Sequence, residues 1–115
     1  MSKNAAVLCL ILWAITRVAY ADTASEIDHL LGFIEASDCV FVRNGDKHDA
    51  AAARDHIQRK HAYAKRWIET AEQFIEYTAT KSSTTGKSYS VICAGREEPS
   101  ADWLKRELGR FRASQ

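Results

Sequence analysis

Four stretches of the chain carry apolar residues at the three- and four-residue spacing of a helix buried along one face. The first runs from Ser25 to Ala36, and the second runs from about Asp49 to Tyr63. The third runs from about Lys65 to Thr80, and the last from Ser100 to about Arg112. The third stretch has the widest apolar stripe, so it is the predicted core helix. That stripe consists of Trp67, Ile68, Ala71, Phe74, Ile75 and Thr78.

Two short segments are typical of extended chain. Residues 39–42 are rich in β-branched and aromatic side chains, and residues 88–93 alternate between apolar and polar side chains. A turn containing Asn44 and Gly45 follows the first segment, and residues 94–99 have the composition of a loop. No internal repeat is evident. We therefore expect a mainly α fold, with about four helices around one core and at most a small two-stranded β element.

The first 21 residues have the pattern of a secretory signal peptide. Lys3 supplies a positive charge, and residues 5–16 form an apolar run that is short for a membrane span of roughly 20 residues. A small-x-small cleavage site ends at Ala21. We expect cleavage there, a single domain over residues 22–115, a periplasmic location and no stable membrane insertion afterwards. The alternative is an N-terminal anchor that is not cleaved.

Length and charge narrow the class of protein further. A chain of 115 residues with a 46% hydrophobic fraction fits one folded domain and excludes wholesale disorder. Its net charge is +1, and residues 22–115 hold 14 basic and 15 acidic side chains. This balance argues against a strongly basic nucleic-acid binder, so we expect no nucleic-acid partner.

The cysteines predict a disulfide. Cys9 lies in the predicted signal peptide, which leaves Cys39 and Cys93 in the domain. Two cysteines in an exported domain favour one disulfide. It would close a loop of 55 residues, for which the chain-entropy model gives about 4 kcal/mol of stabilisation at most. The alternative is a pair of buried free thiols.

The familiar catalytic and cofactor motifs are absent from the sequence. Residues 85–88 contain the Gly-Lys-Ser of a phosphate-binding loop, but Lys81 stands where that motif requires glycine. The histidines lack the spacing of a zinc site, and no Ser/His/Asp set can be assigned. We therefore expect no metal and no cofactor, and we assign no catalytic residue.

One group of polar residues suggests a binding site. His56 and Lys60 are four residues apart, so they lie on the same face of the second predicted helix. Ala52 and Ala53, one turn earlier, leave room beside them, and Arg43 comes from the turn before this helix. Together these donors could hold a carboxylate, a phosphate or a sugar acid. Alternatively, Arg43 or Lys60 pairs with an acid such as Glu72 and fixes the turn against the core helix.

Four segments carry a family resemblance. They are Phe41-Val42-Arg43-Asn44-Gly45-Asp46-x-His48, His56-x-x-x-Lys60, Thr70-Ala71-Glu72-Gln73-Phe74-Ile75 and Ser82-Ser83-x-Thr85-Gly86-Lys87-x-Tyr89-x-Val91. In order and spacing they resemble the YfeK-like family of small exported bacterial proteins, a domain of unknown function, over about residues 27–108. The resemblance implies a mainly helical protein of the Gram-negative envelope. It implies no activity, and the disulfide prediction rests on the cysteine count alone.

Polar residues make up a high proportion of these segments, which raises the expectation of a site. The candidate binding residues are Arg43, Asn44, His56, Lys60, Glu72, Ser83, Thr85 and Tyr89. We expect a non-catalytic binding or interaction module for an envelope protein or a small anionic ligand. One alternative is a small hydrolase in which His56 or Glu72 acts as general base for a loop hydroxyl. Another is a structural or assembly factor, in which Arg43 and Glu72 pair and are buried.

Overall fold

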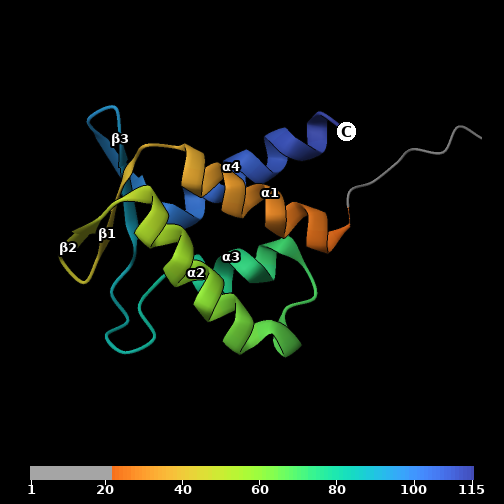
Figure 1. The fold of residues 1–115 in the computed structure, drawn as a ribbon, viewed down its shortest axis with the longest axis horizontal. Helices are drawn as coiled ribbons and strands as arrows, with labels where there is room; N and C mark the ends of the chain where they lie inside the picture. Colours follow the sequence, from red (N-terminus) through yellow and green to blue (C-terminus); the bar gives the residue numbers. More distant parts are fainter. Residues whose placement is uncertain (1–21) are drawn as a thin grey trace, which may run out of the picture.

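The computed structural model describes residues 22–115, so the predicted signal peptide lies outside the described residues. Four helices lie to one side of an antiparallel sheet of four strands (Figure 1). The helices are α1 (Thr23–Ala36), α2 (Ala50–Ala64), α3 (Ala71–Ala79) and α4 (Ser100–Ala113), with a 3-10 helix η2 (Lys65–Trp67) after α2. The strands are β1 (Val40–Arg43), β2 (Asp46–His48), β3 (Ser90–Cys93) and β4 (Arg96–Pro99), in the order β2-β1-β3-β4.

The fold is therefore α+β, and the prediction of a mainly α fold with at most two strands is wrong. The predicted segments do become the central strands β1 and β3, which pair antiparallel. The missed strands, β2 and β4, lie at the two edges and are almost entirely polar. Each is held by the backbone hydrogen bonds of its hairpin and buries little side-chain surface, so neither shows apolar alternation.

The chain contains two hairpin–helix units that the sequence does not reveal as a repeat. The first unit is β1-β2-α2 and the second is β3-β4-α4, and equivalent positions lie 50 residues apart. Asn44 and Gly45 turn the first hairpin with φ of 52° and 81°, and Ala94 and Gly95 turn the second with φ of 50° and 77°. Both pairs have the positive φ values of a type I′ turn, whose twist suits a two-residue hairpin. The two units therefore repeat the same backbone geometry, and not an evident sequence pattern.

The two units meet along the β1–β3 seam. Phe41 pairs with Val91 at its centre, and both side chains are buried on the sheet face that the helices cover. Cys39, just before β1, forms a disulfide with Cys93 at the end of β3, with 4.8 Å between their Cα atoms. This confirms the predicted disulfide, and it places a covalent link between the two units.

Helix α3 is the centre of the core, as its apolar stripe predicts. Phe74 and Ile75 are fully buried, and they pack with the apolar faces of α1 and α4. The predicted helix from Lys65 is nevertheless interrupted, because Thr70 begins α3 with a capping box formed with Gln73. Trp67 therefore lies outside the core and is half exposed. None of the helices in residues 22–115 is long and apolar enough to cross a membrane.

Candidate functional site

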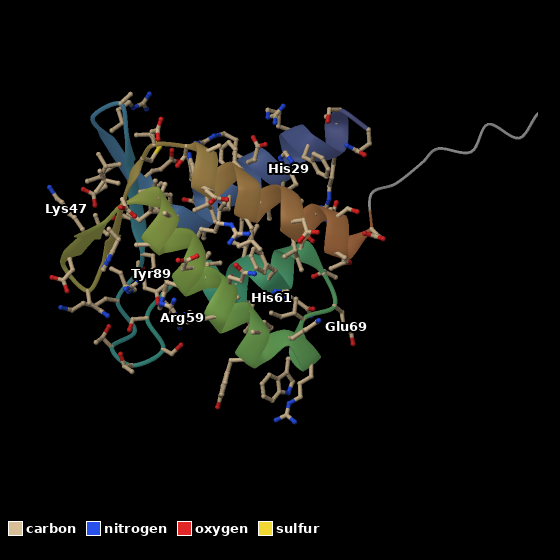
Figure 2. The ribbon with its side chains drawn as sticks, in the orientation of Figure 1. His29, Lys47, Arg59, His61, Glu69 and Tyr89 are labelled. Carbon is tan, nitrogen blue, oxygen red and sulfur yellow. A yellow bond between two sulfur atoms is a disulfide. The ribbon has the colours of Figure 1, made fainter. Side chains whose placement is uncertain are left out.

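A shallow pocket opens where the first hairpin, α2 and the loop before β3 meet. Its volume is about 220 Å³. The hairpin supplies Arg43 and Asn44, and α2 supplies His56 and Lys60 on one face. Tyr89, which is labelled in Figure 2, completes the wall from its position directly before β3. With Ser83, six of the eight predicted binding residues thus line one pocket.

Lys60 and His56 both contact the hydroxyl of Tyr89. The Lys60 ammonium donates to Tyr89 Oη at 3.2 Å and to the carbonyl oxygen of Lys81 at 3.1 Å. Its nitrogen also lies 5.0 Å from the centroid of the Tyr89 ring, within the range of a cation–π contact. Tyr89 Oη is 3.3 Å from Nε2 of His56. Tyr89 is buried, so its ring fixes the position of both donors.

The direction of these hydrogen bonds determines what the pocket offers a ligand. An ammonium only donates, so Tyr89 Oη accepts from Lys60 and its own hydrogen is free for Nε2 of His56. A neutral imidazole that accepts at Nε2 carries its proton on Nδ1. Lys60 keeps one ammonium hydrogen, and Arg43 has five N–H groups. The pocket is therefore rich in donors, which is the chemistry that an oxyanion requires.

The electrostatic environment agrees with this conclusion. Burial lowers the pKa of His56 to about 4, helped by the positive charges of Arg43, Lys60 and Arg59 and by His48. His56 is consequently neutral at pH 7. Within residues 22–115, no carboxylate forms an ion pair with Arg43, Arg59 or Lys60. These cations therefore remain available to a negatively charged ligand.

The loop of residues 82–87 is ordered by its own hydroxyl groups. Ser82 is buried, and its Oγ accepts from the main-chain N–H groups of Thr84 and Thr85 at 3.3 Å each. Thr85 Oγ1 donates to Asn44 Oδ1 at 2.6 Å, and Asn44 Nδ2 donates to Ser82 Oγ at 3.3 Å. Asn44 and Thr85 therefore join the first hairpin to this loop and leave Ser83 at the pocket wall.

A larger groove of about 430 Å³ adjoins the pocket and shares His56, Lys60 and Ser83 with it. Its other lining residues are Arg59, Tyr63, Ala64, Trp67 and Tyr77. The sequence pattern does not predict this groove, because it places Trp67 on the apolar stripe of the core helix. Tyr63 could have indicated an exposed aromatic surface, because it is a large aromatic residue that lies off the apolar stripe of its helix.

Glu72 does not join the other candidate residues. It lies in the first turn of α3, and its carboxylate accepts two hydrogen bonds from Arg112 of α4, at 2.6 and 3.0 Å. These bonds lower the pKa of Glu72. Arg112 also binds the buried carboxylate of Glu26, at 2.7 and 3.0 Å. The Arg43–Glu72 pair that a purely structural role predicts is thus replaced by a link between α1, α3 and α4.

The catalytic alternative gains no support from this geometry. In the part of the chain described here, the hydrogen bonds of the His56 ring are made to Tyr89 and not to a loop hydroxyl. The hydroxyls of Ser82, Thr84 and Thr85 bind within the loop or to Asn44. Ser83 lines the pocket with His56, but within residues 22–115 its hydroxyl forms no hydrogen bond with the His56 ring. Residues 22–115 also contain no group of three His, Cys, Asp or Glu side chains that could hold a metal ion.

The comparison with known proteins defines the class of protein. The chain belongs to a family of unknown function, DUF5329, whose model matches residues 21–112. It is similar to the uncharacterised protein YfeK of Salmonella typhimurium, with 46% identity over 55 residues. The match covers 48% of this chain and 46% of that protein, so the chain spans about half the length of this curated relative. No solved structure matches the chain. The resemblance to the YfeK-like family is thereby confirmed.

Proposed function

We propose that this protein is a non-catalytic module that binds a small oxyanion, a carboxylate or a phosphate, in the pocket between the first hairpin and α2. The observation that carries the proposal is a set of cations that have no carboxylate partner among residues 22–115 and that surround a neutral histidine. Lys60 and Arg43 provide the charge, and His56 lines the pocket as a neutral side chain. Tyr89 holds Lys60 and His56 in place before the ligand arrives.

We propose the periplasm as the site of this function. Two features support that location: the signal-peptide pattern of residues 1–21 and the disulfide between Cys39 and Cys93. Disulfides persist in oxidising compartments such as the periplasm and are rare in the cytosol. Fractionation of cells that express the full chain tests the proposal. Recovery of the full, uncleaved chain in the cytosolic fraction would contradict it.

The binding proposal is tested by isothermal titration calorimetry of the purified chain with sodium phosphate and with galacturonate. Sodium chloride at matched ionic strength serves as the blank. We expect saturable binding of at least one of these anions. Lys60→Ala should weaken it at least about tenfold, because it removes a charged donor that is worth about 1.5–3 kcal/mol.

Lys105→Ala is the matched control. Lys105 is an exposed lysine on α4 that does not line the pocket, so its loss should leave anion affinity unchanged. Equal effects of Lys60→Ala and Lys105→Ala would mean that anions bind through net charge alone. That result, or the absence of saturable binding, would contradict the proposed site.

A further inference from the structure

The groove beside the anion pocket gathers the exposed aromatic side chains of residues 22–115. Tyr63 is 86% exposed, Trp67 51% and Tyr77 47%. They come from α2, η2 and α3, so three separate elements bring them to one place. Large aromatic residues normally bury most of their surface. Three of them around one groove therefore indicate a surface that a ligand covers.

Positive charge accompanies these rings along the groove. Arg59 and Lys60 line the groove, and the Arg66 guanidinium lies over the Trp67 ring at 4.2 Å from its centroid. The groove and the anion pocket share Lys60, so one ligand can occupy both. Such a ligand must carry an oxyanion at one end and present flat or apolar ring faces along its length.

We infer that the ligand is an acidic oligosaccharide, with one acid group in the pocket and its sugar rings against Tyr63, Trp67 and Tyr77. This inference rests on the proposed function, because it uses Lys60 as the anchor of the acid group. A sugar ring places C–H groups against an aromatic face and hydroxyls at its edge, where Ser83 and the tyrosine hydroxyls can bind them.

A single-stranded nucleic acid also combines rings with negative charge, but the charge distribution favours the sugar acid. Binding to nucleic acid depends mainly on neutralising many phosphates, one for each nucleotide. Residues 22–115 hold 14 basic and 15 acidic side chains, and the pocket and groove together contain only a few of the basic ones. These few cations suit a ligand with a small number of acid groups.

The test compares four probes by calorimetry on the purified chain: galacturonate, tetragalacturonate, uncharged maltotetraose and a four-residue thymidine oligonucleotide. We expect tetragalacturonate to bind about tenfold more tightly than galacturonate. Trp67→Ala should weaken tetragalacturonate binding about three- to tenfold, as expected for the loss of one stacking contact. It should leave galacturonate binding unchanged, because the pocket does not include Trp67.

Two further variants separate stacking from a general loss of structure. Trp67→Phe keeps a ring and should retain most of the tetragalacturonate affinity. Val40→Ala removes an exposed apolar side chain from β1, outside the groove, and should change nothing. Lys60→Ala should weaken both acidic probes.

Three outcomes would overturn the inference. They are tetragalacturonate binding no tighter than galacturonate binding, an unchanged tetragalacturonate affinity in Trp67→Ala, and tighter binding of the oligonucleotide than of tetragalacturonate. In each case, galacturonate binding that depends on Lys60 would leave the proposed function standing. If neither galacturonate nor phosphate binds at all, the inference and the proposed function both fail.

Discussion

The two hairpin–helix units share a backbone plan but fill it with different side chains. Ala53 of α2 is a small buried residue, and beside it lies a cavity of about 20 Å³ that His56 also lines. The equivalent residue of α4, 50 positions later, is Trp103. Its ring is buried and packs 4.6 Å from Phe33 and 5.6 Å from Phe41, measured between ring centroids. Equivalent positions thus leave space in one unit and fill it in the other.

The charges differ in the same way. In the second unit, Arg106 binds the carboxylate of Glu98 with two hydrogen bonds, at 3.0 and 2.7 Å. The equivalent residues of the first unit are His56 and His48, which carry no negative charge. Arg110 binds Glu107 with two hydrogen bonds, whereas no carboxylate pairs with its equivalent, Lys60, within the described residues.

The two units therefore differ in how their polar side chains are paired. In the second unit, Arg106 and Arg110 donate their hydrogen bonds to carboxylates of the same unit, and the Arg106–Glu98 pair joins α4 to the sheet. In the first unit, Arg43 and Lys60 line a pocket and form no ion pair with a carboxylate within residues 22–115.

The largest expected effect is the loss of stability when the buried Trp103 ring is removed from the second unit. Trp103→Ala should lower the free energy of unfolding by about 3–5 kcal/mol, because it removes a buried aromatic ring and leaves a cavity. Ala53→Gly is the matched change in the first unit and should cost only about 0.5–1 kcal/mol, the usual difference in a helix. Urea denaturation measures both. Equal costs for the two variants would show that Trp103 is not the packing centre of the second unit.

The disulfide between the units should have the next largest effect. Because it closes a loop of 55 residues, its loss in the Cys39→Ser/Cys93→Ser variant should cost about 2–4 kcal/mol. The measurement is urea denaturation of the variant and of the parent chain, with and without a phosphine reductant. Reduction should destabilise the parent and leave the variant unchanged. Superimposable curves for parent and variant would contradict a role of the disulfide in joining the units.

The sequence predicts the parts of this fold that depend on apolar burial. The four helices, the central strands and the disulfide follow from apolar spacing, β-branched residues and cysteine count. The edge strands β2 and β4 do not, because a hairpin needs only suitable turn residues and backbone hydrogen bonds. Asn44-Gly45 is such a turn signal, and with more weight on it β2 could have been predicted. Ala94 at φ of 50° gives no comparable signal for β4.

The candidate site is predictable to a similar degree. His56 and Lys60 follow from helical spacing, and Arg43 follows from the turn that precedes their helix. The grouping of Glu72 with them could not be checked without the fold, because its partner Arg112 lies 40 residues away in sequence. The role of Tyr89 as the support of both donors also depends on tertiary structure.

The substitution His48→Glu would give the first unit the charge pattern of the second. His48 is equivalent to Glu98, the residue that pairs with Arg106 across the second unit. His48→Glu should therefore place a carboxylate opposite His56 and beside the cations of the pocket. Anion affinity should fall about tenfold, because the new carboxylate competes with the ligand and repels it. His48→Gln, which adds no charge, should leave the affinity within about twofold of the parent.

The same substitution should change the pH dependence of stability. The pKa of His56 is about 4 in the folded chain and about 6.5 when unfolded. The unfolded state therefore binds more protons between these values, and the free energy of unfolding falls as the pH falls from 6.5 to 4. His48→Glu raises the pKa of His56, so this fall should become shallower, whereas His48→Gln should leave it nearly as steep. Nuclear magnetic resonance titration of the His56 ring and urea denaturation across this range measure the two effects. An unchanged His56 pKa in His48→Glu would mean that position 48 does not face His56 as Glu98 faces Arg106, and the equivalence of the two units would then be limited to their backbones.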